Sequence, residues 1–188
     1  MSVAALARRE AHCYVRVMDV TLRHAGPADV AEMRRAVYAA WKWREPWDES
    51  AFRAHLLSAD PDSYVDAFGA RVGDAGLVAA NADGVCGAAW FRRFTRENAR
   101  AGFVDDSTTE LVLAVDDRFR GTGIGGRLLD GLLDLAVDQS VSGLSLHVDS
   151  ANGIARALYL SRGFALHRST PKGAVMVWAE PVGCSSGR

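Results

Sequence analysis

Residues 120–126 form the segment best suited to bind a charged group. They read RGTGIGG and stand directly before an amphipathic stretch that predicts a helix. Glycine allows positive φ and a close approach of the backbone to a ligand. A helix N-terminus adds unpaired N–H groups and a partial positive charge. Together these features predict a pyrophosphate site made of Arg120, Gly121, Thr122, Gly123, Ile124, Gly125 and Gly126.

The same glycines also fit a dinucleotide fingerprint. Gly121, Gly123 and Gly126 have its spacing, and Asp149 stands near the position of the acidic residue that binds a ribose. Against this reading, residues 116–120 separate the preceding apolar run from the first glycine, whereas a dinucleotide turn follows its strand at once. No second set of βαβ units remains for a nicotinamide half. The missing Gly-Lys-Ser/Thr excludes a P-loop.

Two motifs in order resemble the GNAT superfamily of acetyl-CoA-dependent N-acetyltransferases. The first is the apolar run Leu113, Ala114 and Val115 followed by Arg120 and the glycines. The second comprises Asn152, Ala155, Leu158, Tyr159, Gly163 and Phe164. The resemblance covers residues 20–180 and is most specific over 109–165. It implies a mixed α/β sheet that is splayed at its centre, with helices on both faces.

The resemblance also implies roles for individual residues. Leu113, Ala114 and Val115 would bind the pantetheine arm, with Asn152 beside it, and residues 120–126 would hold the pyrophosphate of acetyl-CoA. Tyr159 would be the acid, since a phenol with a pKa of about 10 stays protonated at neutral pH. Glu110 or His147 would be the general base, and a water route remains a third alternative.

The resemblance implies direct attack by a primary amine of a small molecule or peptide in a ternary complex. Alternatives are an NAD(P)- or flavin-dependent oxidoreductase and a non-catalytic acyl-CoA-binding module.

The tryptophans of residues 41–47 fall where the family places an acceptor lid, and they could enclose an amine by cation–π contact or pack in the core: Trp41, Trp43 and Trp47. The arginines of residues 92–100 are expected to be solvated: Arg92, Arg93, Arg96 and Arg100.

Hydrophobic periodicity predicts the elements that position these residues. Strands are expected near 19–23, 76–80, 85–94, 111–115, 144–148, 164–168 and 174–179, with a hairpin turn at 81–84. Helices are expected after Pro27, over 49–57, from the glycine loop to about residue 138, and from the cap Asn152 to Gly163. The run 111–115 is apolar throughout, which indicates a strand buried on both faces.

Composition limits the partners and the location. The chain has 188 residues and a net charge of −1, so bulk charge does not recruit nucleic acid or a membrane surface. Cys13, Cys86 and Cys184 show no metal spacing, and their odd, sparse set favours a reducing compartment. We therefore expect a cytoplasmic monomer or homodimer without a metal. Its single domain would span residues 19–180, with an extension at 1–18 and a tail at 181–188.

Overall fold

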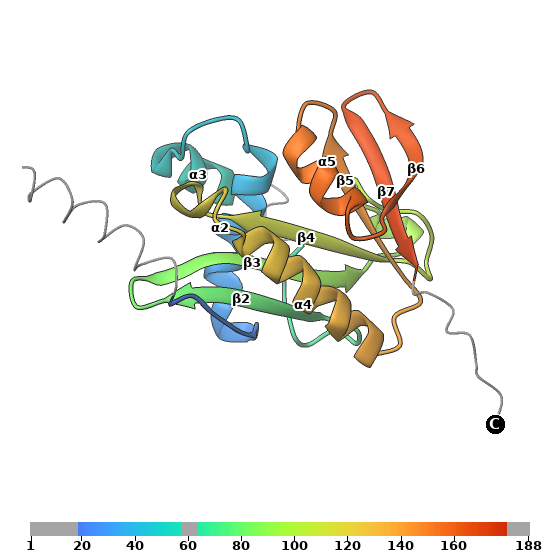
Figure 1. Cartoon of the computed structure of the whole chain (residues 1–188), viewed down its shortest axis with the longest axis horizontal. Coiled ribbons are helices and arrows are strands. Elements are labelled where there is room, and N and C mark those ends of the chain that lie inside the picture. The colour runs from blue at the N-terminus through green and yellow to red at the C-terminus, as the bar shows by residue number, and fades with distance from the viewer. Residues whose placement is uncertain (1–18, 58–63, 180–188) are drawn as a thin grey trace, which may run out of the picture.

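The computed structural model describes residues 19–57 and 64–179. The predicted extension and the predicted tail lie outside these residues. The described part is a single mixed sheet with helices on both faces (Figure 1). This confirms the predicted fold class.

The sheet has seven strands in the order β1-β2-β3-β4-β5-β7-β6. The strands are β1 (Thr21–His24), β2 (Ala75–Asn81), β3 (Gly84–Arg93), β4 (Thr109–Val115), β5 (Gly143–Asp149), β6 (Ala165–Thr170) and β7 (Gly173–Ala179). All neighbours pair antiparallel except β4 and β5, which are parallel. The predicted turn at 81–84 joins β2 to β3.

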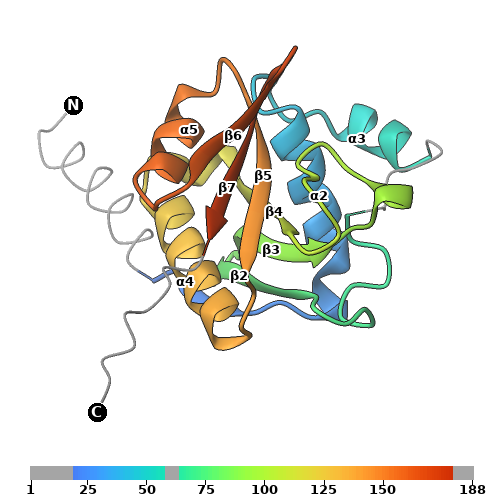
Figure 2. The same ribbon diagram turned by 90° about the vertical axis from the view of Figure 1, so that its right-hand side faces the viewer.

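The parallel pair is where the sheet opens. Only Thr109↔Leu144 and Glu110↔Ser145 pair between β4 and β5. Beyond these residues the strands diverge, and Figure 2 shows β5, β6 and β7 turned away from β2, β3 and β4. For this reason Val112, Leu113 and Val115 of β4 are only half-buried, although the apolar run predicted burial on both faces.

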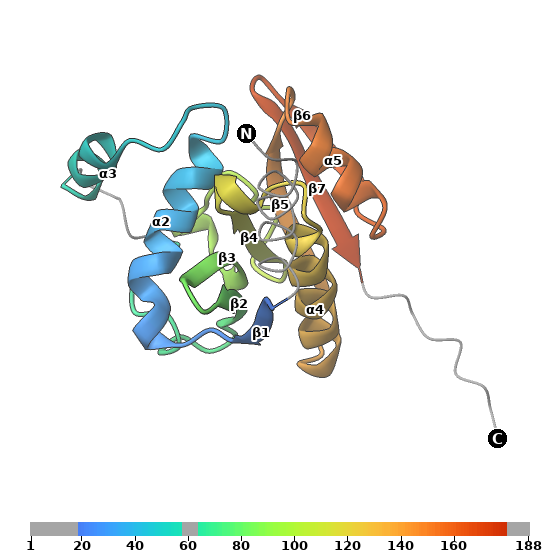
Figure 3. The same cartoon turned by 60° about the vertical axis from the view of Figure 1, so that its left-hand side comes forward.

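Alternating side chains separate the core into two parts, one on each face. Helix α2 (Val30–Trp41) covers one face, where Met33 packs with Val78, Ala88 and Trp90. The other face is covered by α4 (Ile124–Asp138) and α5 (Gly153–Leu160) (Figure 3). The buried stripe of α4 begins at Ile124 and includes Leu128, Leu129, Leu132 and Ala136, which matches the predicted periodicity.

Local signals explain where the helices begin and end. Pro27 begins a short 3-10 turn, Pro27–Asp29, that leads into α2. The Asp48 side chain accepts hydrogen bonds from the N–H groups of Ser50 and Ala51 at the start of α3 (Glu49–Leu56). Asn152 caps α5 in the same way, and Gly163, with φ of 85°, follows its end.

The expectation that the arginines of residues 92–100 are solvated is wrong for Arg92. Arg93 and Arg96 are exposed, but Arg92 is 1 % exposed and forms a bidentate ion pair with buried Asp74, at 2.9 and 2.7 Å. Arg92 is the penultimate residue of β3, where alternation directs its side chain into the protein. Asp74, 18 residues earlier, supplies the compensating charge that a buried guanidinium needs.

Candidate active site

The divergence of β4 and β5 leaves a wedge-shaped break in the backbone pairing of the sheet, which we call the cleft. We call its closed end, at Glu110 and Ser145, the vertex. Its open end, formed by residues 116–126 and by Asp149 at the end of β5, is the mouth. Val115 follows Glu110 by five positions along β4, which corresponds to about 17 Å of strand. All predicted catalytic and cofactor-binding residues lie on β4, on β5, on α5 or at the mouth.

The glycine loop lies at the mouth and leads directly into α4. Gly121 and Gly123 have φ of 75° and 88°, a region that strongly favours glycine. A Cβ atom built on either residue would meet no protein atom within 4 Å. Packing therefore does not require these glycines, whereas the backbone conformation does. The resulting loop can approach a phosphate through its backbone, and Gly123 is the N-cap of α4.

The side chains of the loop are engaged with the protein. Arg120 forms an ion pair with Asp117 at 2.7 Å and donates to the carbonyl oxygen of Trp43 at 2.9 Å. The Thr122 hydroxyl donates to the carbonyl oxygen of Phe119 at 2.6 Å. Arg120 is thus held at the mouth by exposed partners, which it could exchange for an anionic ligand.

The edge of β4 that faces the cleft offers backbone hydrogen-bonding groups. β3 pairs with one edge of β4 along its whole length, from Thr109 to Val115. On the other edge, the pairing with β5 stops at Glu110. An extended chain can add to such a free edge as a further strand would. Leu113, Ala114 and Val115 lie on this part of β4, between the vertex and the glycine loop.

Tyr159 approaches the sheet from α5, on the α4 side. Its side chain is buried and packs against Phe164, with ring centroids 5.5 Å apart. Burial raises the pKa of its phenol to about 12, so it stays protonated at neutral pH. No group among the described residues hydrogen-bonds to its hydroxyl, which leaves the O–H free to serve a ligand.

Glu110 lies at the vertex and is only 4 % exposed. Its Oε1 accepts from the Tyr64 hydroxyl at 3.0 Å and from the Gly102 N–H at 2.9 Å. Burial raises the pKa of this carboxyl to about 7, even though both hydrogen bonds lower it. Near neutral pH it can therefore both accept and release a proton.

His147 lies two residues beyond Ser145 on β5, so both side chains lie on the same face of the strand. Its Nε2 is 3.0 Å from the Thr170 hydroxyl. Burial is the main cause that lowers the pKa of the imidazole, which favours the neutral ring at pH 7. His147 lies between vertex and mouth and stays a second candidate for the base.

The three tryptophans do not form one cluster. The Trp43 carbonyl binds Arg120, and the next residue, Arg44, approaches Asp149 at 3.5 Å across the mouth. Trp47 is stacked under Arg35, whose guanidinium carbon is 4.3 Å from the ring centroid. Trp41 is 65 % exposed. Of the three, Trp43 lies at the mouth and Trp47 lines a neighbouring cavity.

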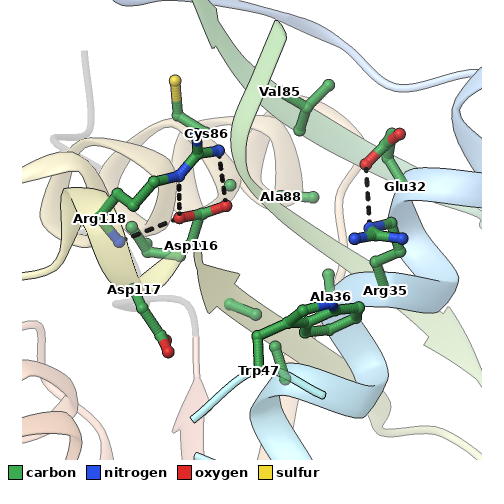
Figure 4. Close-up of a pocket in the computed structure, with 14 residues that line it drawn as sticks. Glu32, Arg35, Ala36, Trp47, Val85, Cys86, Ala88, Asp116, Asp117 and Arg118 are labelled. Carbon is green, nitrogen blue, oxygen red and sulfur yellow. Dashed lines mark hydrogen bonds and ion pairs between the residues drawn. The ribbon is translucent and has the colours of Figure 1, made fainter. Parts of the chain in front are cut away.

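This cavity lies between α2, the start of β3 and the end of β4, and has a volume of about 340 Å³. Figure 4 shows its rim, where Arg118 pairs with Asp116 and Arg35 with Glu32. Small side chains such as Ala36, Ala88 and Ala114 form the floor. Glu110, His147 and Tyr159 do not line it. The cavity is therefore a neighbour of the mouth and does not unite the predicted catalytic residues.

Sequence reasoning missed Tyr64 and Ser145. Tyr64 is 46 residues from Glu110, and no motif links the two positions. Ser145 could have been found from its place in the alternating strand 144–148, since it shares a face with His147. Among the described residues, no cluster of three His, Cys, Asp or Glu could hold a metal, and no helix is long and apolar enough to cross a membrane.

A comparison with known protein families identifies the family of this chain. The family model of the GNAT acetyltransferases matches residues 34–164. The chain belongs to the GNAT acetyltransferase family. The matched range includes the glycine loop, β4, β5 and α5, which form the cleft. A search of curated proteins finds no significant match.

Solved structures share the GNAT fold of this chain. A ribosomal-protein-alanine N-acetyltransferase from Brucella melitensis is 24% identical with a TM-score of 0.60, and the match covers 85% of this chain and 99% of that one. The yncA protein of Salmonella typhimurium, solved with its cofactor acetyl-CoA, is 23% identical with a TM-score of 0.65, and the match covers 88% and 96%. The paia N-acetyltransferase of Thermoplasma acidophilum, in complex with coenzyme A, is 14% identical with a TM-score of 0.61, and the match covers 86% and 99%.

Proposed function

We propose that this protein transfers the acetyl group of acetyl-CoA to a primary amine of a small molecule or peptide, by direct attack in a ternary complex. The observation that carries the proposal is the cleft itself. A glycine loop with positive φ lies at its mouth, and a strand with a free edge leads from there to a buried carboxylate. Family membership favours acetyl-CoA over a nicotinamide or flavin cofactor.

The residues of the cleft fit the parts of acetyl-CoA. The N–H groups at the start of α4 and the Arg120 side chain would hold the pyrophosphate. The free edge of residues 113–115 would hold the pantetheine arm, with Asn152 at the start of α5 nearby. Bound acetyl-CoA supplies the activated acetyl group. One N–H of β4 would polarise its carbonyl.

Proton transfer requires an acceptor and a donor. An alkyl ammonium with a pKa of about 10 is mostly protonated at pH 7, so Glu110 would accept its proton before the nitrogen attacks. The C–N bond forms as the C–S bond breaks, the nitrogen releases its second proton to solvent, and the Tyr159 hydroxyl would donate a proton to the leaving sulfur. Tyr159 is then reprotonated from solvent, and Glu110 returns its proton to solvent.

The acceptor is expected to enter beside Trp43 and Trp47. The carboxylates around this entrance, Asp117 at the mouth and Glu32 in the cavity, suit a cationic amine. Sparse cysteines fit a cytoplasmic enzyme, and monomer and homodimer both fit the fold.

Ligand binding and turnover test the proposal in two steps. In thermal unfolding, acetyl-CoA at 100 times its Kd should stabilise the protein by about 2.7 kcal/mol, and NADH at equal concentration should not. A thiol-release assay across amines, peptides and antibiotics then identifies acceptors. Stabilisation by NADH alone would favour the oxidoreductase. Binding of acetyl-CoA without turnover on any amine would favour the acyl-CoA-binding module.

A further inference from the structure

The vertex carries three polar residues from distant parts of the chain: Tyr64 donates to Glu110, and Ser145 is the partner of Glu110 in register. Glu110 lies on β4, Ser145 on β5, and Tyr64 follows α3 in the chain. Glu110 is 4 % exposed and Ser145 is fully buried. Polar groups in such surroundings are costly unless each finds a hydrogen-bond partner. The hydrogen-bond partners of these three side chains therefore indicate which function the vertex can have.

One oxygen of Glu110 is fixed from two sides. Oε1 accepts from the Tyr64 hydroxyl and from the Gly102 N–H. Tyr64 is itself anchored, because its carbonyl oxygen accepts from the indole N–H of Trp90 at 3.1 Å. Gly102 leaves no space at this point, since a Cβ there would lie 2.8 Å from Cδ of Glu110. The carboxylate cannot rotate without losing both hydrogen bonds.

The other oxygen has no partner within the protein. Oε2 of Glu110 and Oγ of Ser145 are buried, and neither atom hydrogen-bonds to any described residue. Glu110 and Ser145 are paired in register, at the last paired position before β4 and β5 separate. A single water can satisfy two such oxygens when they lie on one polar wall. Partners in register direct their side chains to the same face of the sheet, so these two unpartnered oxygens lie on one face where the cleft begins.

We propose that Tyr64 is a positioning residue for catalysis: it holds Oε1 of Glu110, so that Oε2 and the Ser145 hydroxyl bind a water that takes the proton of the acceptor amine. This inference rests on the proposed acetyl transfer. The ammonium gives one proton to the water, the water passes one to Oε2, and the amine nitrogen is left neutral with its lone pair. No oxidant or further reactant is needed.

The charged groups around Glu110 come from several elements. Arg100 of the preceding loop and Arg168 of β6 both lower the pKa of the carboxyl. On β3 the neighbour in register is Arg92, which is paired with Asp74. His147 lies further along β5. The hydrogen bond from Tyr64 also lowers the pKa, against the larger effect of burial, so its removal should raise the pKa.

The titration of Glu110 tests this arrangement without any acceptor. We suggest ¹³C NMR of the side-chain carboxyls in the full-length protein, with the Glu110 signal assigned by its loss in Glu110→Gln. Tyr64→Phe should shift this titration upward by about one pH unit, because a hydrogen bond to a charged group is lost. Ser145→Ala should shift it in the same direction by less. Tyr38→Phe is the matched control, a buried tyrosine of α2 without a hydrogen-bonded hydroxyl among the described residues.

Turnover provides the second measurement, on any amine that the thiol-release assay identifies as an acceptor. The acidic limb of kcat against pH should move upward in Tyr64→Phe with its titration, so that turnover falls several-fold at pH 6.5 and recovers at pH 9. A purely structural role would lower turnover equally at every pH. The proposal is overturned if the Glu110 titration in Tyr64→Phe coincides with that of wild type. If Tyr64→Phe does not fold, Ser145→Ala alone decides by the same criterion. Absence of CoA release by the wild type would instead count against the proposed function.

Discussion

At the vertex of the cleft, polar side chains are buried and each contact is specific, whereas at the mouth the side chains are exposed and the backbone carries the site. Glu110 and the neighbouring Arg92–Asp74 pair are 4 % exposed or less. Arg120 and Asp117 of the mouth are 42% and 46% exposed. One cleft can thus separate two tasks. Under the proposed function, backbone shape would bind an anion where water is present, and buried side chains would transfer protons where water is scarce.

The largest difference between the vertex and the mouth should appear in the free energy of unfolding. Arg92→Met leaves Asp74 buried without its partner, so the free energy of unfolding should fall by about 3–5 kcal/mol. Arg118→Met removes the exposed ion pair to Asp116 and should cost less than about 1 kcal/mol. Urea unfolding of both variants measures this. Similar losses would show that burial does not distinguish the two regions. Arg92→Met combined with Asp74→Leu should recover part of the stability.

The second difference concerns ligand affinity. Gly123→Val forces a branched residue into φ of 88° at the start of α4 and should weaken acetyl-CoA binding by at least about a hundredfold, roughly 2.7 kcal/mol. Gly73→Val is the control, because Gly73 has φ of 87°, no protein atom within 4 Å of a built Cβ and a position outside the glycine loop. Calorimetry should find normal affinity in Gly73→Val. Equal weakening in both variants would assign the effect to general strain.

The third prediction concerns the free energy of unfolding as a function of pH, which should depend on the titration of Glu110 at the vertex. The pKa of Glu110 is about 7 in the folded protein against an ordinary 4.5, so the folded state holds this proton more tightly. The stability from Glu110 is complete below pH 4.5 and is lost as pH rises through 7. Glu110→Gln does not titrate, and relative to wild type it should gain up to about 3 kcal/mol between pH 4.5 and 8. If the free energies of unfolding of wild type and Glu110→Gln changed in parallel with pH, the raised pKa of Glu110 would be contradicted.

Turnover separates the two candidate bases. We expect Glu110→Gln to lower kcat by about 10²-fold at neutral pH, and by less at high pH, where more of the amine is already neutral. His147→Gln should lower kcat only a few-fold, with little pH dependence. A pH–rate profile of both variants on one amine measures this. If His147→Gln shows the loss that recovers at high pH, the roles are reversed. If neither variant does, proton removal belongs to water or to the backbone.

Tyr159→Phe should have an effect confined to chemistry. Its hydroxyl has no partner among the described residues, so its removal should leave folding and acetyl-CoA affinity unchanged. Turnover should fall, because the proton donor for the leaving sulfur is lost. Single-turnover kinetics show whether chemistry limits the rate. An unchanged chemical step would exclude Tyr159 as the acid.

Local patterns in the sequence determined the elements and the mouth of the cleft. Apolar spacing and the glycine run placed α4 from its start to Asp138, and Asn152 and Gly163 marked the ends of α5. These features could be predicted because they depend on neighbours a few residues apart. Gly121 and Gly123 required positive φ, and the structure has it at both.

Only the tertiary structure decided which groups are buried together. The sequence places Arg92 at the surface, but in the structure it is buried beside Asp74. The sequence likewise gives Glu110 as the end of a strand, and only the structure shows that Tyr64 and Gly102 cover it. The free edge of β4 likewise exists because β5 pairs with only two of its residues. Burial and charge pairing depend on segments far apart in the chain. The pKa of Glu110, and with it the chemistry of the vertex, is therefore a property of the fold and not of any motif.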